Sequence, residues 1–196
     1  MLLNLSLFAH NVGKFTMARL PYADLNNPAI HDLVTQIEAE RGSVIHLYQM
    51  LLHSPAVAQG WLNHLTGIRL KSQVSGDLRE LIIMRVAIIN RAPYEADQHA
   101  PIALKEGVTQ EQLDALPNWK DHTDLFSDKE QAVLAYTDAM TRDIQVPNAV
   151  YEAIATQFDA QTVVELTATI ATYNMVSRFL EALHIHSDDI NHTPIP

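Results

Sequence analysis

Helix start and stop signals recur along most of this chain, and convincing strand alternation of apolar and polar residues is missing. Four places pair a capping residue with a proline or with a reciprocal side chain three residues later. They are Asn27 with Pro28, Ser54 with Pro55, Thr109 with Gln112, and Ser127 with Glu130. Glycines that can end a helix follow at Gly42, Gly67 and Gly107. These signals predict an all-α fold.

The expected helices follow from this punctuation. They cover residues 28–42, 43–53, 55–67, 78–90, 93–107 and about 159–186, with others starting at Thr109, at Ser127 and after Pro147. Asp77 is the expected cap of the helix over 78–90, whose apolar residues cover more than one face. That helix is therefore the expected core helix. No internal repeat or linker interrupts the pattern, so we predict a single-domain helical bundle of about seven or eight helices.

The domain is expected to span residues 17–186. Residues 1–16 read as a flexible extension or as an upstream start, because Met17 opens the sequence MARLPYADL and could itself be the natural start. Residues 187–196 form a polar tail that ends in proline. The apolar residues near the N-terminus lack a preceding cationic region and are too few to span a membrane.

Composition limits the classes of partner. The chain carries 23 acidic residues against 13 Lys plus Arg, a formal charge of -10, so nucleic acid would be repelled. We predict no nucleic-acid partner, no membrane partner and a cytoplasmic location. The chain has no cysteine, which excludes disulfides, thiolate metal sites and redox chemistry through a thiol of its own.

The segment ELIIMRVAIINRAPYEADQH, residues 80–99, holds the candidate chemistry. If Pro93 starts a helix, Glu95 and His99 lie four residues apart on one face, where a carboxylate can orient an imidazole for acid/base work. Glu80 lies near the start of the preceding helix, and Tyr94 adds a phenol. Plainer interpretations remain: a surface pair for Glu95 and His99, a first-turn acid for Glu80 and a half-buried core residue for Tyr94.

An anionic substrate would need a cation and a hydrogen-bonding wall. Arg85, Arg91 and Arg178 are the candidate cations. The polar Asn174, in the middle of the last long helix, is a candidate for a buried hydrogen bond, an interface or the pocket wall. A salt bridge is the alternative for each arginine. The ten histidines include no pattern of three or four convergent ligands. We therefore predict no metal and no cofactor.

Several separated segments together resemble the carboxymuconolactone decarboxylase family, which shares its fold with the alkylhydroperoxidase D group. The segments are Arg79-Glu80, Tyr94-Glu95, His99 and Gly107 around the apolar helix, HSPAVAQGW at 53–61, and VELTATIATYNMVSRFLEAL at 164–183. The likeness runs from Arg19 to Ile185. It implies an alkylhydroperoxidase D-like helical fold and a small homo-oligomer, a trimer or a hexamer.

The resemblance also implies roles. In the peroxidase branch an acid and a histidine serve two cysteines; here Glu80 and His99 match the acid and the histidine, whereas Ala92 and Glu95 occupy the cysteine positions. Thiol peroxidase activity is therefore not expected. In the decarboxylase branch His99 would be the general acid/base, Glu95 its orienting partner or the proton donor, Glu80 a relay member, and Tyr94 a hydrogen-bond donor to an oxyanion.

Two hypotheses remain open at this point. The first is an acid/base enzyme that decarboxylates, or performs related lyase chemistry on, a small carboxylated or lactone-like substrate. The second is a non-catalytic binding or assembly protein on the same scaffold, since a fold alone does not decide function.

Overall fold

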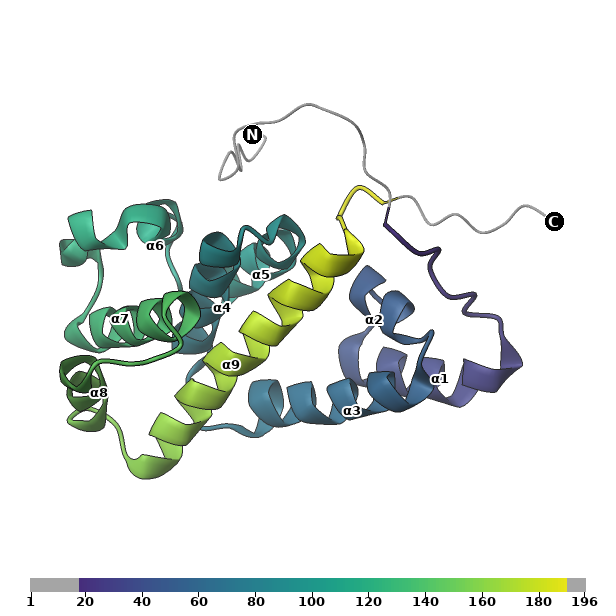
Figure 1. Cartoon of the computed structure of the whole chain (residues 1–196), viewed down its shortest axis with the longest axis horizontal. Helices are drawn as coiled ribbons and strands as arrows, with labels where there is room; N and C mark the ends of the chain where they lie inside the picture. Colours follow the sequence, from purple (N-terminus) through teal and green to yellow (C-terminus); the bar gives the residue numbers. More distant parts are fainter. Residues whose placement is uncertain (1–17, 190–196) are drawn as a thin grey trace. The chain divides into compact units, whose positions relative to one another are not determined.

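The structure, a computed structural model, describes residues 18–189. Over this range the chain forms α-helices, a few short 3-10 or π turns and no strand (Figure 1). The helices are α1 His31–Arg41, α2 His46–Leu51, α3 Pro55–Thr66, α4 Gly76–Asn90, α5 Pro93–Glu106, α6 Gln110–Ala115, α7 Asp128–Arg142, α8 Asn148–Ala155 and α9 Ala160–Leu183. The all-α prediction is confirmed. The count within these residues is nine, because α2, α6 and α8 are separate short helices.

Local signals place most helix ends as the sequence predicts. Both capping boxes form, at Thr109 and at Ser127, and Gly42 and Gly107 adopt the left-handed conformation after α1 and α5. The start of α4 differs from the prediction. Its N-cap is Ser75 rather than Asp77, because Gly76 already has helical geometry and Asp77 lies in the first turn, where an acid is favoured.

The described chain separates into two compact units. The core unit comprises residues 73–178, and the terminal unit comprises residues 18–72 together with 179–189. Helix α9 contributes its residues up to Arg178 to the core unit and the remainder to the terminal unit. The predicted extension over residues 1–16 lies outside the described residues, as does most of the predicted tail. The boundary of one domain at 17–186 stays a prediction.

Helix α4 forms the centre of the core unit. Every residue from Arg79 to Ala87 is buried, which agrees with the apolar residues on all sides of this segment. Helices α5 and α7 pack against it (Figure 1). The apolar core collects Leu81, Met84, Ala96, Ala100, Leu113, Leu116, Trp119, Phe126 and Leu134. An interior of this kind fixes the rotation of α4, so it also fixes where its charged residues point.

The terminal unit is held by contacts within and between its two segments. The backbone amide of Arg19 donates to the carbonyl of Leu183 at 2.9 Å, and the ring of His46 stacks on Tyr22 at a centroid distance of 4.7 Å. Trp61 packs against Phe179 at 5.1 Å. After α3, a π-helical turn over Gly67–Lys71 continues the helix past the predicted end at Gly67.

Candidate functional site

The α4–α5 hairpin brings Glu80 and His99 together. Helix α4 ends at Asn90. The next residue, Arg91, has a left-handed conformation (φ 56°) that turns the chain, and Pro93 starts α5 two residues later. The two helices then run in opposite directions, so a residue early in α4 meets one in the middle of α5. Glu80 Oε2 and His99 Nδ1 lie 2.7 Å apart. We call these two residues the Glu80–His99 pair.

Arg79 binds the other oxygen of the same carboxylate. Its Nε donates to Glu80 Oε1 at 3.1 Å, and its Nη2 lies 3.6 Å from Glu106. Glu80 is fully buried, and a buried carboxylate is stable only when its oxygens are hydrogen-bonded or paired. The guanidinium on one side and the imidazole on the other meet this requirement, so the carboxylate is held in one orientation.

Helix α9 contributes two further residues to this part of the core unit. The ring of Tyr173 meets the ring of His99 edge-on, with a centroid distance of 5.2 Å and an interplanar angle of 89°. One turn later, the Ser177 hydroxyl is hydrogen-bonded to Glu95 Oε2 and lies 2.9 Å from the Tyr173 carbonyl. The earlier residue on α5, Glu95, thus meets the later residue on α9, Ser177, whereas His99 meets Tyr173. This reversed order means that the two helices run antiparallel here.

Exposure distinguishes the two members of the Glu80–His99 pair. About 10% of the His99 side chain is exposed, against none of Glu80. His99 is therefore the member of the pair that has exposed side-chain surface. When Nδ1 carries the ring proton and donates it to Glu80, Nε2 becomes the basic nitrogen. The arrangement can thus present an oriented imidazole that accepts or delivers a proton.

Two other predicted catalytic residues lie close by in sequence but make different contacts. Glu95 is 2% exposed and accepts a hydrogen bond from Ser177, whereas Glu80 lies against Nδ1 of the His99 ring. The orienting or proton-donating role of Glu95 stays a prediction. Tyr94 is also buried, at 3% exposure. Two acids, a phenol and a histidine are therefore buried in the same part of the core unit. We take this region of α4, α5 and α9 as the candidate site.

Arg85 lies in a buried ion pair with Asp138. Its Nε and Nη2 bind the two oxygens of Asp138 at 2.5 and 2.9 Å, and Nη1 donates to the carbonyl of Leu116 at 2.7 Å. Trp119 Nε1 adds a bond of 3.3 Å to the same carboxylate. Arg85 and Glu80 are five residues apart on α4, so they project from different sides of the helix. These contacts within the protein account for the presence of an arginine in an apolar helix, and no substrate is needed to explain it.

Asn174 also forms hydrogen bonds within the protein. Its amide nitrogen donates to Thr141 Oγ1 and to the Ile170 carbonyl, each at 3.0 Å. Its oxygen accepts from Asn90 at 3.1 Å and from Arg178 at 2.9 Å. These bonds link α4, α7 and α9 and use the full capacity of the amide. Arg91 is exposed at the hairpin turn, and substrate binding by any of these residues stays a prediction.

Neither Ser177 nor Tyr173 is among the site residues predicted from the sequence. Both residues lie on the same face of a predicted helix, four residues apart, and a serine on an otherwise apolar face is a signal for a buried hydrogen bond. The signal does not name the partner, because Glu95 is 82 residues away.

Within residues 18–189, no group of three or more His, Asp or Glu side chains is arranged to hold a metal ion. In the same range no helix has the length and hydrophobicity needed to cross a membrane.

Sequence comparison places part of the chain in a known family. Residues 55–139 match the model of the carboxymuconolactone decarboxylase family, and this range includes Glu80, Glu95 and His99. The chain is also 29% identical over 136 residues to the uncharacterized protein YnjA of Escherichia coli K12, covering 69% of this chain and 71% of that protein.

Structure comparison identifies the fold. The alkylhydroperoxidase AhpD core of an uncharacterized peroxidase-related protein from Ralstonia eutropha JMP134 matches with a TM-score of 0.76 and 17% identity, over 90% of this chain and 95% of that one. The debrominase Bmp8 in complex with 2,3,4-tribromopyrrole matches with a TM-score of 0.73 and 17% identity, over 89% and 95%. The chain, which has no cysteine, is therefore similar to the carboxymuconolactone decarboxylase family over residues 55–139 and has an alkylhydroperoxidase D-like fold.

Proposed function

We propose that the chain is an acid/base catalyst in which His99 moves a proton and Glu80 orients it. The observation that carries this proposal is the contact of 2.7 Å between His99 Nδ1 and a fully buried Glu80 carboxylate. A carboxylate in this position selects the tautomer with a basic Nε2 and stabilises the imidazolium that forms when Nε2 takes up a proton. Glu95, held by Ser177, is the second acid of the proposed site.

The proposed reaction is a decarboxylation of a small unsaturated lactone that carries a carboxylate, or related lyase chemistry. The bond between the ring carbon and the carboxylate breaks, carbon dioxide leaves, and the electron pair enters a dienolate. The imidazolium of His99 then protonates a carbon of the dienolate, and solvent returns the proton to His99. One proton is consumed for each carbon dioxide released, so the charge balances. The Tyr94 hydroxyl would donate to the dienolate oxygen.

The absence of cysteine supports acid/base chemistry over thiol chemistry within the same family. Thiol peroxidation needs a thiolate nucleophile, and the 196 residues contain none. The proton-moving pair is retained, whereas Glu95 stands at one of the positions that the resemblance assigns to a cysteine. A carboxylate there can accept or donate a proton but cannot form a disulfide.

Turnover of a substrate panel tests this proposal. Purified full-length chain is incubated with unsaturated lactones that carry a carboxylate, and with matched lactones that lack it, while carbon dioxide release and absorbance are followed. His99→Asn should lower kcat by about 100-fold or more, since general acid/base catalysis contributes 10²–10⁴-fold. His122→Asn, at an exposed position of the core unit, is the matched control and should keep full activity. Equal turnover by His99→Asn and wild type would contradict the proposal.

A binding or assembly role without catalysis is the second candidate. The Glu80–His99 pair is 90% or more buried, so it could equally fix the α4–α5 hairpin. This candidate predicts that His99→Asn lowers stability while no lactone in the panel is turned over by wild type. A homo-oligomer, a trimer or a hexamer, is proposed for either function, and mass measurement in solution tests it.

A further inference from the structure

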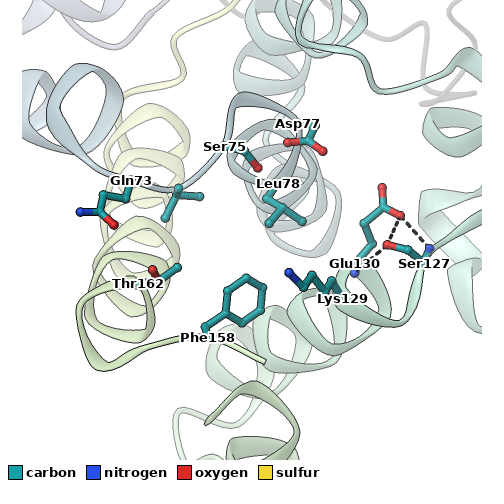
Figure 2. A pocket seen from close by; sticks show the side chains of 10 residues that line it. Gln73, Ser75, Asp77, Leu78, Ser127, Lys129, Glu130, Phe158 and Thr162 are labelled. Carbon is teal, nitrogen blue, oxygen red and sulfur yellow. Dashed lines mark hydrogen bonds between the residues drawn. The ribbon is translucent and has the colours of Figure 1, made fainter. Parts of the chain in front are cut away.

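A second candidate site lies in the core unit and is lined by residues of α4, α7 and the start of α9. Here a pocket of about 420 Å³ opens between these elements, and Figure 2 shows its side chains. This volume falls in the range of about 300–1,000 Å³ that is typical of small-molecule sites. Neither Glu80 nor His99 lines it, so it is separate from the proposed catalytic pair.

The pocket combines an apolar middle with charged edges. Leu78 of α4 and Phe158, in the α8–α9 connection, supply partly buried apolar surface. Asp77 and Lys129 supply one charge of each sign, from α4 and α7 (Figure 2). In the view of Figure 2, Leu78 lies between these two charged side chains. A ligand in the pocket would therefore meet apolar surface flanked by a carboxylate and an ammonium group.

The two charges are available to a ligand. Within residues 18–189, the Asp77 carboxylate has no hydrogen bond or ion pair, and Lys129 is in no ion pair either. The Lys129 ammonium lies 5.6 Å from the centre of the Phe158 ring, a contact that keeps it beside the apolar surface. The third charged residue of the pocket, Glu130, is already occupied by Ser127 and Gln112.

Lys129 is placed where its own helix does not favour it. It lies in the first turn of α7, where the helix dipole favours an acid over a cation. Asp77, in the first turn of α4, has the sign that its helix favours. The lysine therefore contributes less to the stability of its helix than an acid would, and its contact with Phe158 directs the ammonium to the pocket.

We propose that this pocket binds a small zwitterion with an apolar body, in the size range of an amino acid or a dipeptide. The ammonium group of the ligand would bind Asp77, its carboxylate would bind Lys129, and its apolar side chain would contact Leu78 and Phe158. The carboxylate of Asp77 would repel a purely anionic ligand, and the ammonium group of Lys129 would repel a purely cationic one. Only a ligand that carries both charges can form an ion pair with Asp77 and with Lys129.

Calorimetric titration of the full chain with four probes tests this proposal. The probes are L-phenylalanine, the dipeptide leucyl-phenylalanine, 3-phenylpropionate, which lacks the ammonium group, and phenethylamine, which lacks the carboxylate. At least one zwitterion should bind, and the two single-charge analogues should bind at least about tenfold more weakly, since hydrogen bonds to charged groups are among the stronger ones. Binding of neither zwitterion at millimolar concentration would overturn the proposal, as would equal binding of the analogues.

Variants then locate the binding site. Asp77→Asn and Lys129→Gln should each weaken binding of the zwitterion at least about tenfold, because each removes one charged contact. Asp32→Asn, a first-turn acid of α1, and Lys105→Gln, an exposed lysine of α5, change the same charges outside the pocket and should leave binding unchanged. Binding that survives both pocket variants would contradict the assignment. All four positions are polar and outside the core, so thermal melts should show folded variants.

Discussion

The Nδ1 atom of His99 lies 2.7 Å from Oε2 of Glu80, and Arg79 binds the other oxygen of that carboxylate. The imidazole of α5 and the guanidinium of α4 thus share one buried carboxylate. This arrangement both stabilises the α4–α5 hairpin and fixes the direction of the His99 ring. Substitutions at Glu80 should therefore affect stability and turnover together, in proportions that differ with the replacement.

Replacing Glu80 by alanine should lower the free energy of unfolding by about 3–5 kcal/mol, because Arg79 and His99 both lose the buried carboxylate that they bind. Replacement by glutamine keeps the volume and one acceptor, so it should cost less. Urea unfolding measures both variants. Glu152→Ala, at an exposed position of α8, serves as the control and should change stability by less than about 0.5 kcal/mol. A Glu80→Ala variant as stable as wild type would show that the carboxylate is not holding this part of the structure.

Ser177→Ala removes the hydroxyl that binds Glu95. The buried carboxylate loses a hydrogen bond, so the free energy of unfolding should fall by about 1–3 kcal/mol. Ser43→Ala, at an exposed position, is the control. Thermal and urea unfolding measure the stability of both variants. Equal stability of Ser177→Ala and Ser43→Ala would contradict a stabilising role for this contact. If Glu95 acts in the reaction, Ser177→Ala should also lower kcat on any substrate found in the lactone panel.

The Arg85–Asp138 pair gives a prediction that distinguishes a structural ion pair from a substrate site. Asp138→Ala leaves the Arg85 guanidinium buried without its carboxylate and should cost about 3–5 kcal/mol. The double variant Arg85→Met with Asp138→Leu should recover most of this loss, since apolar residues of similar volume can replace a buried pair. Urea unfolding of the single and double variants measures the recovery.

The control for that experiment is Lys120→Ala. Its ammonium lies 3.9 Å from Asp138, but 69% of the side chain is exposed, so its removal should cost less than about 1 kcal/mol. A double variant that is less stable than Asp138→Ala alone would contradict the structural interpretation. Turnover that survives in the double variant would also remove Arg85 from the list of substrate-binding residues.

Much of the fold follows from sequence because its signals are local. A capping box spans three residues, and the pairs Thr109–Gln112 and Ser127–Glu130 form as expected. The four-residue spacing of Glu95 and His99 likewise places them on one face of a helix. The actual partner of His99 depends on how α4 is rotated against α5, which the packing of the whole core decides. The spacing therefore does not reveal that Glu80 meets the Nδ1 side of the His99 ring.

Long-range partners explain the remaining differences. Arg85 and Asn174 were ambiguous in sequence because a buried polar residue can bind either a ligand or a distant part of the chain. Asp138 lies 53 residues from Arg85, and Asn90 lies 84 residues from Asn174. No pattern within one helix identifies such partners. The division of the chain into a core unit and a terminal unit is equally beyond local signals.

Glu181 in the terminal unit predicts a dependence of stability on pH. Burial raises the pKa of its carboxyl above the ordinary value of 4.5, and the charge of His186 acts in the opposite direction. The folded state therefore holds this proton at a pH where the unfolded state has lost it. Between the ordinary pKa and the raised pKa, stability should fall as the pH rises.

Glu181→Gln removes this charge at every pH. The variant should be more stable than wild type near pH 7, by at most about 1 kcal/mol because solvent screens a partly exposed group. Below the ordinary pKa the two proteins should have equal stability, since the wild-type carboxyl is then neutral. Thermal melts across this pH range measure the difference, with the exposed Glu152→Gln as control. A gain in stability that is the same at all pH values would contradict the titration of Glu181 as its cause.

Nitrogen-15 NMR of the histidine rings tests the central claim most directly. Wild type and His99→Asn are compared to assign the His99 signals, and the protonated nitrogen is then read from their shifts. The account predicts that the neutral ring carries its proton on Nδ1, bonded to Glu80, and leaves Nε2 as the base. A neutral ring with its proton on Nε2 would contradict it, because Nδ1 could then not donate to Glu80 and the basic nitrogen would face a buried carboxylate.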